Sequence, residues 1–178
     1  DPDIRRLPLD GSPTSLVEST FTDFAAQYSP DGRRIAFESG RTGDTEEVWL
    51  ADADGSNPTR LTRGPGRHQG SPQWSPDGAS LLFVARSAGS SELMRVDIAS
   101  GRLEELSRDD ERTRYGAYAR DGRSIYFSSD RSGAWQVWRM DADGANAEQL
   151  STDGGYDPRD WLGDGAIYYS KETDRGLF

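Results

Sequence analysis

The chain repeats a short pattern with a period of about 44 residues. Asp31, Asp77, Asp121 and Asp164 each precede a glycine, at spacings of 46, 44 and 43 residues. A second Asp-containing marker keeps the same rhythm, as DADG at 52–55, DIASG at 97–101 and DADG at 141–144. A fixed period of this length indicates one supersecondary unit used several times.

The segments between these markers have the pattern of β-strands, because apolar residues alternate or run unbroken for a few positions. One family of segments follows the first marker: RIAF (34–37), SLLFV (80–84), SIYF (124–127) and AIYY (166–169). A second family precedes the second marker: EVWLAD (47–52), ELMRVD (92–97) and QVWRMD (136–141). Helical spacing is nowhere sustained, so each unit is predicted to contain four strands: a and b around the first marker, c and d around the second.

The strands carry apolar residues on both faces. Val48 and Leu50 point to one side of their strand, and Trp49 and Ala51 to the other. A sheet that is apolar on both faces must be covered on both, and stacking four-stranded sheets around an axis does this. The sequence therefore predicts an all-β fold, a β-propeller of four-stranded antiparallel blades. A β-sandwich built from such units would not explain the fixed period.

Two units carry a family resemblance: SPDGRRIAFESGRTGDTEEVWLADADGSNPTRLT (29–62) and RDGRSIYFSSDRSGAWQVWRMDADGANAEQLS (120–151). They resemble the WD-like repeat of TolB-type β-propellers, and the likeness covers essentially the whole chain. The resemblance implies a ring of six blades. It also implies one of three settings, namely a free periplasmic protein, a sensor-like domain of a bacterial regulator or kinase, or the gate of a serine peptidase.

The repeat divides the chain, a single propeller domain over 1–178, into three complete blades and two partial ones. The expected bounds are 1–18 (partial), 19–63, 64–107, 108–151 and 152–178 (partial). We expect a piece of a longer six-bladed ring. The alternative is a four-bladed ring closed by joining the two partial ends, which would bring residues 3–7 and 177–178 together.

Charge and composition exclude several functions. The net charge of −10 and pI near 4.6 argue against nucleic-acid binding, which needs a basic face. No apolar run approaches the ~20 residues of a membrane span, so no membrane insertion is expected. Without cysteine the composition leaves the compartment open. The resemblance implies the periplasm, with the cytoplasm as the alternative, and the oligomeric state stays undetermined.

Strand parity separates two faces of the predicted propeller. The a–b and c–d turns lie on one face, and every Asp-Gly marker falls there. SPDG suits a type I turn with Pro at its second position and Gly in the left-handed conformation, so structure alone explains these residues. The loops that differ between repeats lie on the opposite face, where binding is expected.

Candidate contact residues lie in those loops and at the mouth of the central channel. Strand a is innermost in a propeller, so the residues that enter it surround the channel, and Trp135 is the one tryptophan that does not recur. Mixed charge with aromatic side chains suits a protein or peptide partner. The candidates are Asp23, Phe24, Arg67, His68, Gln69, Arg114, Tyr115, Trp135, Tyr156 and Asp157.

Catalytic and metal motifs are missing from the sequence. DADGSN fails as a calcium loop because Gly55 is its fourth residue rather than its sixth. His68 is the only histidine, and no G-x-S-x-G elbow is present. We therefore expect no cofactor, no metal and no enzymatic activity, but a scaffold that binds a protein or peptide. The alternative is the substrate-gating propeller of a prolyl-oligopeptidase-like serine peptidase, and a metal-dependent propeller lyase is weakened by the single histidine.

Overall fold

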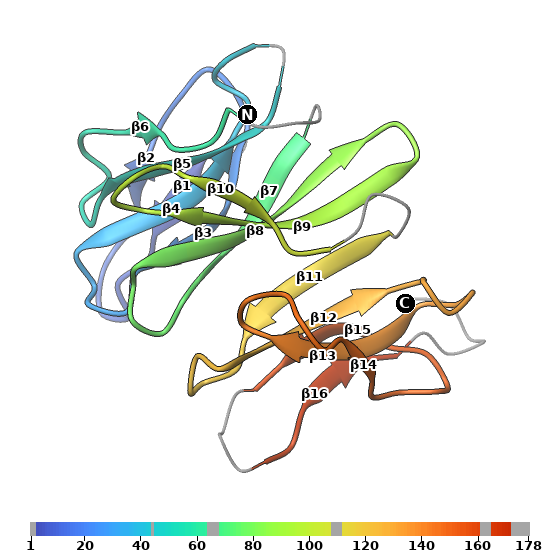
Figure 1. The fold of residues 1–178 in the computed structure, drawn as a ribbon. Helices are drawn as coiled ribbons and strands as arrows, with labels where there is room; N and C mark the ends of the chain where they lie inside the picture. Colours follow the sequence, from blue (N-terminus) through green and yellow to red (C-terminus); the bar gives the residue numbers. More distant parts are fainter. Residues whose placement is uncertain (1–2, 44, 64–67, 108–111, 161–164, 172–178) are drawn as a thin grey trace.

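The regular elements of the chain are all β-strands in the computed structural model, which describes residues 3–43, 45–63, 68–107, 112–160 and 165–171. Three four-stranded antiparallel sheets follow one another along the chain, with a two-stranded sheet before and after them (Figure 1). The predicted all-β fold with four-stranded blades is confirmed. No helix in the described ranges is long and apolar enough to cross a membrane.

We call the three complete sheets blades I, II and III. Blade I contains β3 (Asp23–Tyr28), β4 (Arg34–Ser39), β5 (Glu47–Asp52) and β6 (Thr59–Arg60). Blade II contains β7 (His68–Trp74), β8 (Ser80–Ser87), β9 (Ser90–Asp97) and β10 (Leu103–Glu105). Blade III contains β11 (Thr113–Tyr118), β12 (Ser124–Ser129), β13 (Gln136–Asp141) and β14 (Glu148–Gln149). In each blade the strands pair in chain order, because short turns join antiparallel neighbours.

The two partial sheets lie at opposite ends of the arc (Figure 1). The first pairs β1 (Ile4–Arg6) with β2 (Thr14–Val17), and the second pairs β15 (Tyr156–Arg159) with β16 (Tyr168–Ser170). Neither sheet pairs with a strand of the other among the described residues. The expected strand at 177–178 lies outside the described residues.

The SPDG markers form the turns between the two inner strands of blades I and II. The Gly32 amide donates to the Ser29 carbonyl at 2.8 Å, and Gly32 has the left-handed φ of 68° that its lack of a Cβ permits. The Ser29 hydroxyl donates to Asp31 at 2.6 Å, and Asp31 accepts the Arg33 amide at 3.1 Å. Ser75–Gly78 repeats these contacts. The Ser, Asp and Gly of the marker thus each have a structural role in the turn.

The DADG markers close the outer turns in a similar way. The Gly55 amide donates to the Asp52 carbonyl at 2.8 Å, and the Asn57 side chain donates to the Asp52 carboxylate at 2.6 Å. The copy in blade III repeats the second bond between Asn146 and Asp141 at 2.7 Å. Both asparagines are left-handed, with φ of 52° and 55°, which asparagine tolerates better than most residues. The recurrence of DADG-x-N is therefore explained by turn geometry.

The core lies between successive blades. Phe37, Phe83 and Phe127 occupy the same position of β4, β8 and β12, and each is 0% exposed. They pack respectively against the β1–β2 sheet, blade I and blade II, in three separate apolar clusters. Burial of a phenylalanine contributes about 1.5–3 kcal/mol, so the stacking of blades holds the fold together.

Candidate functional site

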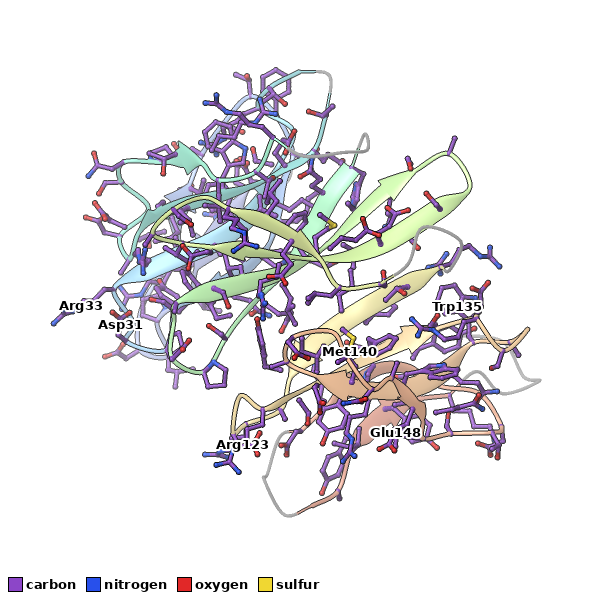
Figure 2. All side chains as sticks on the ribbon, viewed as in Figure 1. Asp31, Arg33, Arg123, Trp135, Met140 and Glu148 are labelled. Carbon is purple, nitrogen blue, oxygen red and sulfur yellow. The ribbon has the colours of Figure 1, made fainter. Side chains whose placement is uncertain are left out.

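The antiparallel pairing gives the molecule two distinct ends. The turns at 29–33, 75–79 and 119–123 lie on what we call the turn face. The β4–β5, β8–β9 and β12–β13 connections and the entries into β7, β11 and β15 lie on the loop face. Figure 2 shows Arg123 and Trp135 at opposite ends of blade III. The strand order agrees with the separation predicted from strand parity.

Each inner strand carries a β-bulge beside the channel. The register of β3, β7, β11 and β15 shifts between Phe24 and Gln27, Gly70 and Gln73, Arg114 and Ala117, and Tyr156 and Arg159. The residue after the start of each shift is left-handed: Ala25 (φ 54°), Ser71 (58°), Tyr115 (52°) and Asp157 (48°). That conformation costs about 1–2 kcal/mol for a residue with a side chain. Its recurrence makes the bulge a part of the repeat.

The bulges surround a small hollow at the channel. It measures about 230 Å³ and is lined by residues of all four inner strands, including Tyr115 and Asp157. Asp157 forms an ion pair with Arg159 at 2.6 Å. These two candidates therefore line the channel rather than the outer loops.

An aromatic and cationic cluster lies on the loop face between blade III and β15. The Arg114 guanidinium lies 4.5 Å from the centre of the Trp135 ring, and that of Arg112 lies 5.7 Å from it. The Tyr156 ring packs at 6.0 Å from Trp135 with a tilt of 35°. We call Arg112, Arg114, Trp135 and Tyr156 the Arg–Trp patch. Arg112 also donates to Asp130 at 2.6 Å, whereas Arg114 forms no ion pair with a described residue.

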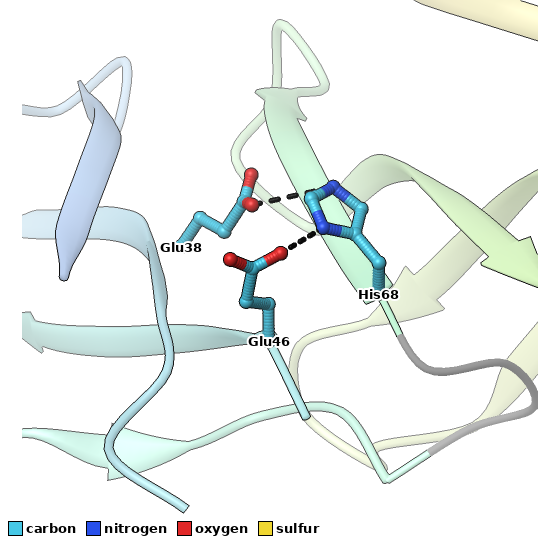
Figure 3. Close-up of side chains that lie close together, drawn as sticks. All are labelled: Glu38, Glu46 and His68. Atoms are coloured by element: carbon cyan, nitrogen blue, oxygen red, sulfur yellow. Dashed lines mark hydrogen bonds and ion pairs between the residues drawn. The ribbon is translucent and has the colours of Figure 1, made fainter. Parts of the chain in front are cut away.

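A second cluster lies on the same face between blades I and II, and we call it the Glu–His cluster (Figure 3). Glu38 comes from β4, Glu46 from the β4–β5 loop and His68 from the start of β7. His68 Nε2 lies 3.3 Å from Glu38 Oε1, and Nδ1 contacts Glu46 Oε2. Burial raises the pKa of the Glu38 carboxyl, opposed by the His68 charge and the Ser71 amide that donates to it.

Two predicted contact residues are buried, and we remove them from the candidates. The Asp23 side chain is 0% exposed and accepts two bonds from Arg41, both at 3.1 Å. Gln69 is also 0% exposed, and its backbone N–H donates to the Glu46 backbone carbonyl at 2.8 Å. Both lie near the start of an inner strand, Asp23 in β3 and Gln69 in β7.

The other predicted residues divide among the clusters. Phe24 is half-buried in β3, and Arg67 lies outside the described residues. The structure joins Arg114, Trp135 and Tyr156 in the Arg–Trp patch and places His68 apart from them in the Glu–His cluster.

Sequence reasoning missed Arg112, Glu38 and Glu46. Alignment of the repeats contains a signal for the glutamates. Glu38 occupies the position of Val84 and Ser128, and Glu46 precedes β5 as Trp135 precedes β13. A charged residue at a buried strand position of one repeat only is unusual, because burial of an unpaired charge is costly.

A profile of the TolB beta propeller domain matches residues 10–116 and 67–176. The chain is 31% identical over 101 residues to an uncharacterised protein, Atu1656, of Agrobacterium fabrum, which covers 57% of this chain and 34% of that protein. It is 40% identical over 58 residues to the uncharacterised peptidase YuxL of Bacillus subtilis, covering 33% of this chain and 9% of YuxL.

Among solved structures, the putative TolB of Agrobacterium tumefaciens superposes with a TM-score of 0.76 at 28% identity. The superposition covers 86% of this chain and 57% of that chain. This chain thus spans about a third of Atu1656 and just over half of the TolB structure. With the four-stranded repeat and the matched profile both in place, the chain belongs to the TolB beta propeller domain family.

Proposed function

We propose that this segment is a non-enzymatic binding platform whose loop face holds an acidic protein or peptide. The Arg–Trp patch is the observation that supports the proposal most directly. Tryptophan, tyrosine and arginine are the residues most often found at the energetic centre of protein interfaces. Here they cluster on the face of loops and away from the repeated turns.

The chemistry of the patch favours a carboxylate beside an apolar group. Arg114 is held over the Trp135 ring and forms no ion pair with a described residue, and in this proposal its guanidinium donates to the partner. A guanidinium binds a carboxylate through two parallel hydrogen bonds. The Trp135 and Tyr156 rings would pack against an apolar side chain next to that carboxylate.

Selection of peptides tests the proposal. A phage-displayed random peptide library is panned on the chain, and the affinity of enriched peptides is measured by fluorescence polarisation. We expect sequences with an aspartate or glutamate next to an aromatic or aliphatic residue. R114A and W135A should each weaken binding at least about tenfold, as loss of a central contact does. Arg123→Ala, an exposed arginine on the turn face, is the matched control and should bind as well as the original chain.

Two results would contradict the proposal. One is selection of peptides without carboxylates. The other is equal binding by R114A and the R123A control. The melting temperatures of all variants are measured in parallel, so that weaker binding can be told from loss of the fold.

A second function is favoured by the match to the peptidase YuxL, in which the propeller would filter peptides toward a catalytic domain outside this chain. The coding sequence on either side distinguishes the two. A hydrolase domain with a G-x-S-x-G elbow supports the gating function, and a winged-helix or kinase domain opposes it.

The periplasmic location also remains a proposal. It rests on the family, and a fusion to a reporter active only in the periplasm tests it.

A further inference from the structure

The Glu–His cluster brings together three ligand groups from two blades. One ligand atom from each of Glu38, Glu46 and His68 lies within 4.8 Å of the others. Imidazole nitrogen and carboxylate oxygen are both ligands of Zn²⁺, at ~2.0–2.2 Å. We propose that these three side chains bind one divalent transition-metal ion, with Zn²⁺ as the ion that suits this mixed set.

A buried carboxylate oxygen that accepts no hydrogen bond supports this inference independently of the spacing. The Glu38 side chain is 1% exposed. Its Oε2 accepts the Ser71 amide at 3.0 Å, but its Oε1 accepts no hydrogen bond among the described residues. Oε1 points toward His68 (Figure 3). An unsatisfied buried carboxylate oxygen costs stability, and a bound cation removes that cost.

The backbone is arranged to admit the Glu38 carboxylate. A Cβ at Gly70 would lie 1.8 Å from Glu38 Oε2, so any side chain there would displace the carboxylate. The equivalent bulge positions in the other inner strands hold Phe24, Arg114 and Tyr156, all large. The hydrogen bond from the Gln69 amide to the Glu46 carbonyl fixes the segments that carry Glu46 and His68 beside each other. The ligands are therefore held in place by the fold.

Charge and access also suit a dication. Two glutamates and a neutral imidazole carry −2, which one Zn²⁺ balances. Exposure increases across the cluster, from 1% for the Glu38 side chain to 23% for His68 and 37% for Glu46. An ion can therefore enter from the loop face, on the side of Glu46. At the junction of blades II and III, the positions equivalent to Glu38, Glu46 and His68 hold Val84, Ser91 and Arg112. At the junction of blade III with the β15–β16 sheet, they hold Ser128, Trp135 and Gly154. Neither can bind a cation, so binding of a single ion is expected.

The decisive experiment uses the single histidine. The chain without an affinity tag is freed of metal with a chelator and labelled with ¹⁵N-histidine. NMR spectra of the imidazole nitrogens are then recorded as ZnCl₂ is added, and every signal belongs to His68 because the chain has a single histidine. We expect a large shift of one His68 ring nitrogen that is complete at one equivalent. Calorimetry should give the same stoichiometry, and the melting temperature should rise with Zn²⁺ concentration because the ion binds only the folded state.

Variants assign the ligands. E38Q, E46Q and H68Q should each lower the affinity for Zn²⁺ at least about tenfold, since loss of even an outer-shell partner of a metal ligand typically has that effect. Glu148→Gln removes an exposed, ion-paired carboxylate far from the cluster and should leave the affinity unchanged. Glu46 is the most exposed ligand, so E46Q is expected to fold even if E38Q does not.

Other outcomes overturn the inference. His68 could instead be an imidazolium held between two carboxylates, without an ion. In that case both ring nitrogens stay protonated, and the spectrum does not change with Zn²⁺. Absence of saturable binding, or equal binding by E46Q and E148Q, would equally exclude the proposed site.

Discussion

Blades I and III have the same scaffold and different loop-face chemistry. β4 pairs with β5 in the same register as β12 with β13, from Ser39 opposite Glu47 and Ser129 opposite Gln136. In both blades an arginine after β4 or β12 stacks on the core phenylalanine and on a tryptophan of the next strand. Yet the residue before the third strand is Glu46 in one blade and Trp135 in the other. The two blades show that the scaffold tolerates replacement of its rim residues.

The two blades differ in the residues that contact these equivalent arginines and in the residue that starts the first turn. Arg41 and Arg131 each donate to the serine two residues earlier, at 2.9 and 3.2 Å. Arg41 also binds buried Asp23, where blade III has Thr113. Likewise Ser29 starts the first turn of blade I, where blade III has Ala119. Three predictions test how far the likeness extends.

The largest effect is expected from the core. Phe37→Ala and Phe127→Ala should each lower the free energy of unfolding by about 3–5 kcal/mol, because each removes a fully buried ring and leaves a cavity. Denaturant unfolding measures both. A strong effect in one blade and none in the other would mean that the two scaffolds are not equivalent.

The arginines should separate the blades. Arg41→Ala should cost about 3 kcal/mol, because it leaves the buried carboxylate of Asp23 without its cation. Arg131→Ala removes the stacking on Phe127 and Trp138, but position 113 holds a threonine and not a carboxylate. This variant should therefore lower the free energy of unfolding by only about 1 kcal/mol.

The double variant Asp23→Asn with Arg41→Ala is the control for the charge. It should recover part of the stability lost in Arg41→Ala, measured by the same denaturant unfolding. Equal losses for the two single arginine variants would show that stacking alone matters.

The smallest expected effect is on the pH dependence of stability, through the aspartates of the turn face. The Ser29 and Ser75 hydroxyls, and then the backbone amides, hold the pKa values of Asp31 and Asp77 below their usual range. A lowered carboxyl pKa stabilises the fold above about pH 4, the ordinary aspartate value, and that stability is lost as pH falls through the folded value.

The melting temperature between pH 2 and 7 provides the test. Asp31→Asn should flatten the acid limb of that curve slightly. Ser29→Ala should flatten it in part, because this variant removes the hydroxyl that donates to Asp31 and keeps the Arg33 amide. An acid limb unchanged by Ser29→Ala would contradict the role of the serine.

Much of the candidate site could not be predicted from sequence. Trp135 stood out because it does not recur, and it does lie beside Arg114 and Tyr156. Asp23 and Gln69 were expected at the channel mouth and are buried, because a period of 44 residues says which strand a residue enters but not which way its side chain turns. The prediction of no metal site rested on the single histidine and did not consider the two glutamates, Glu38 and Glu46, that lie beside His68.

By itself, the sequence determined the repeat, the four strands of each blade and the identity of the turn face. These properties follow from local rules, because turn residues and strand alternation act over a few positions. Only the tertiary structure decided which side chains meet across a junction. Glu38 and His68 are 30 residues apart, and their distance depends on how one blade packs on the next. That packing determines how deeply Glu38 and His68 are buried.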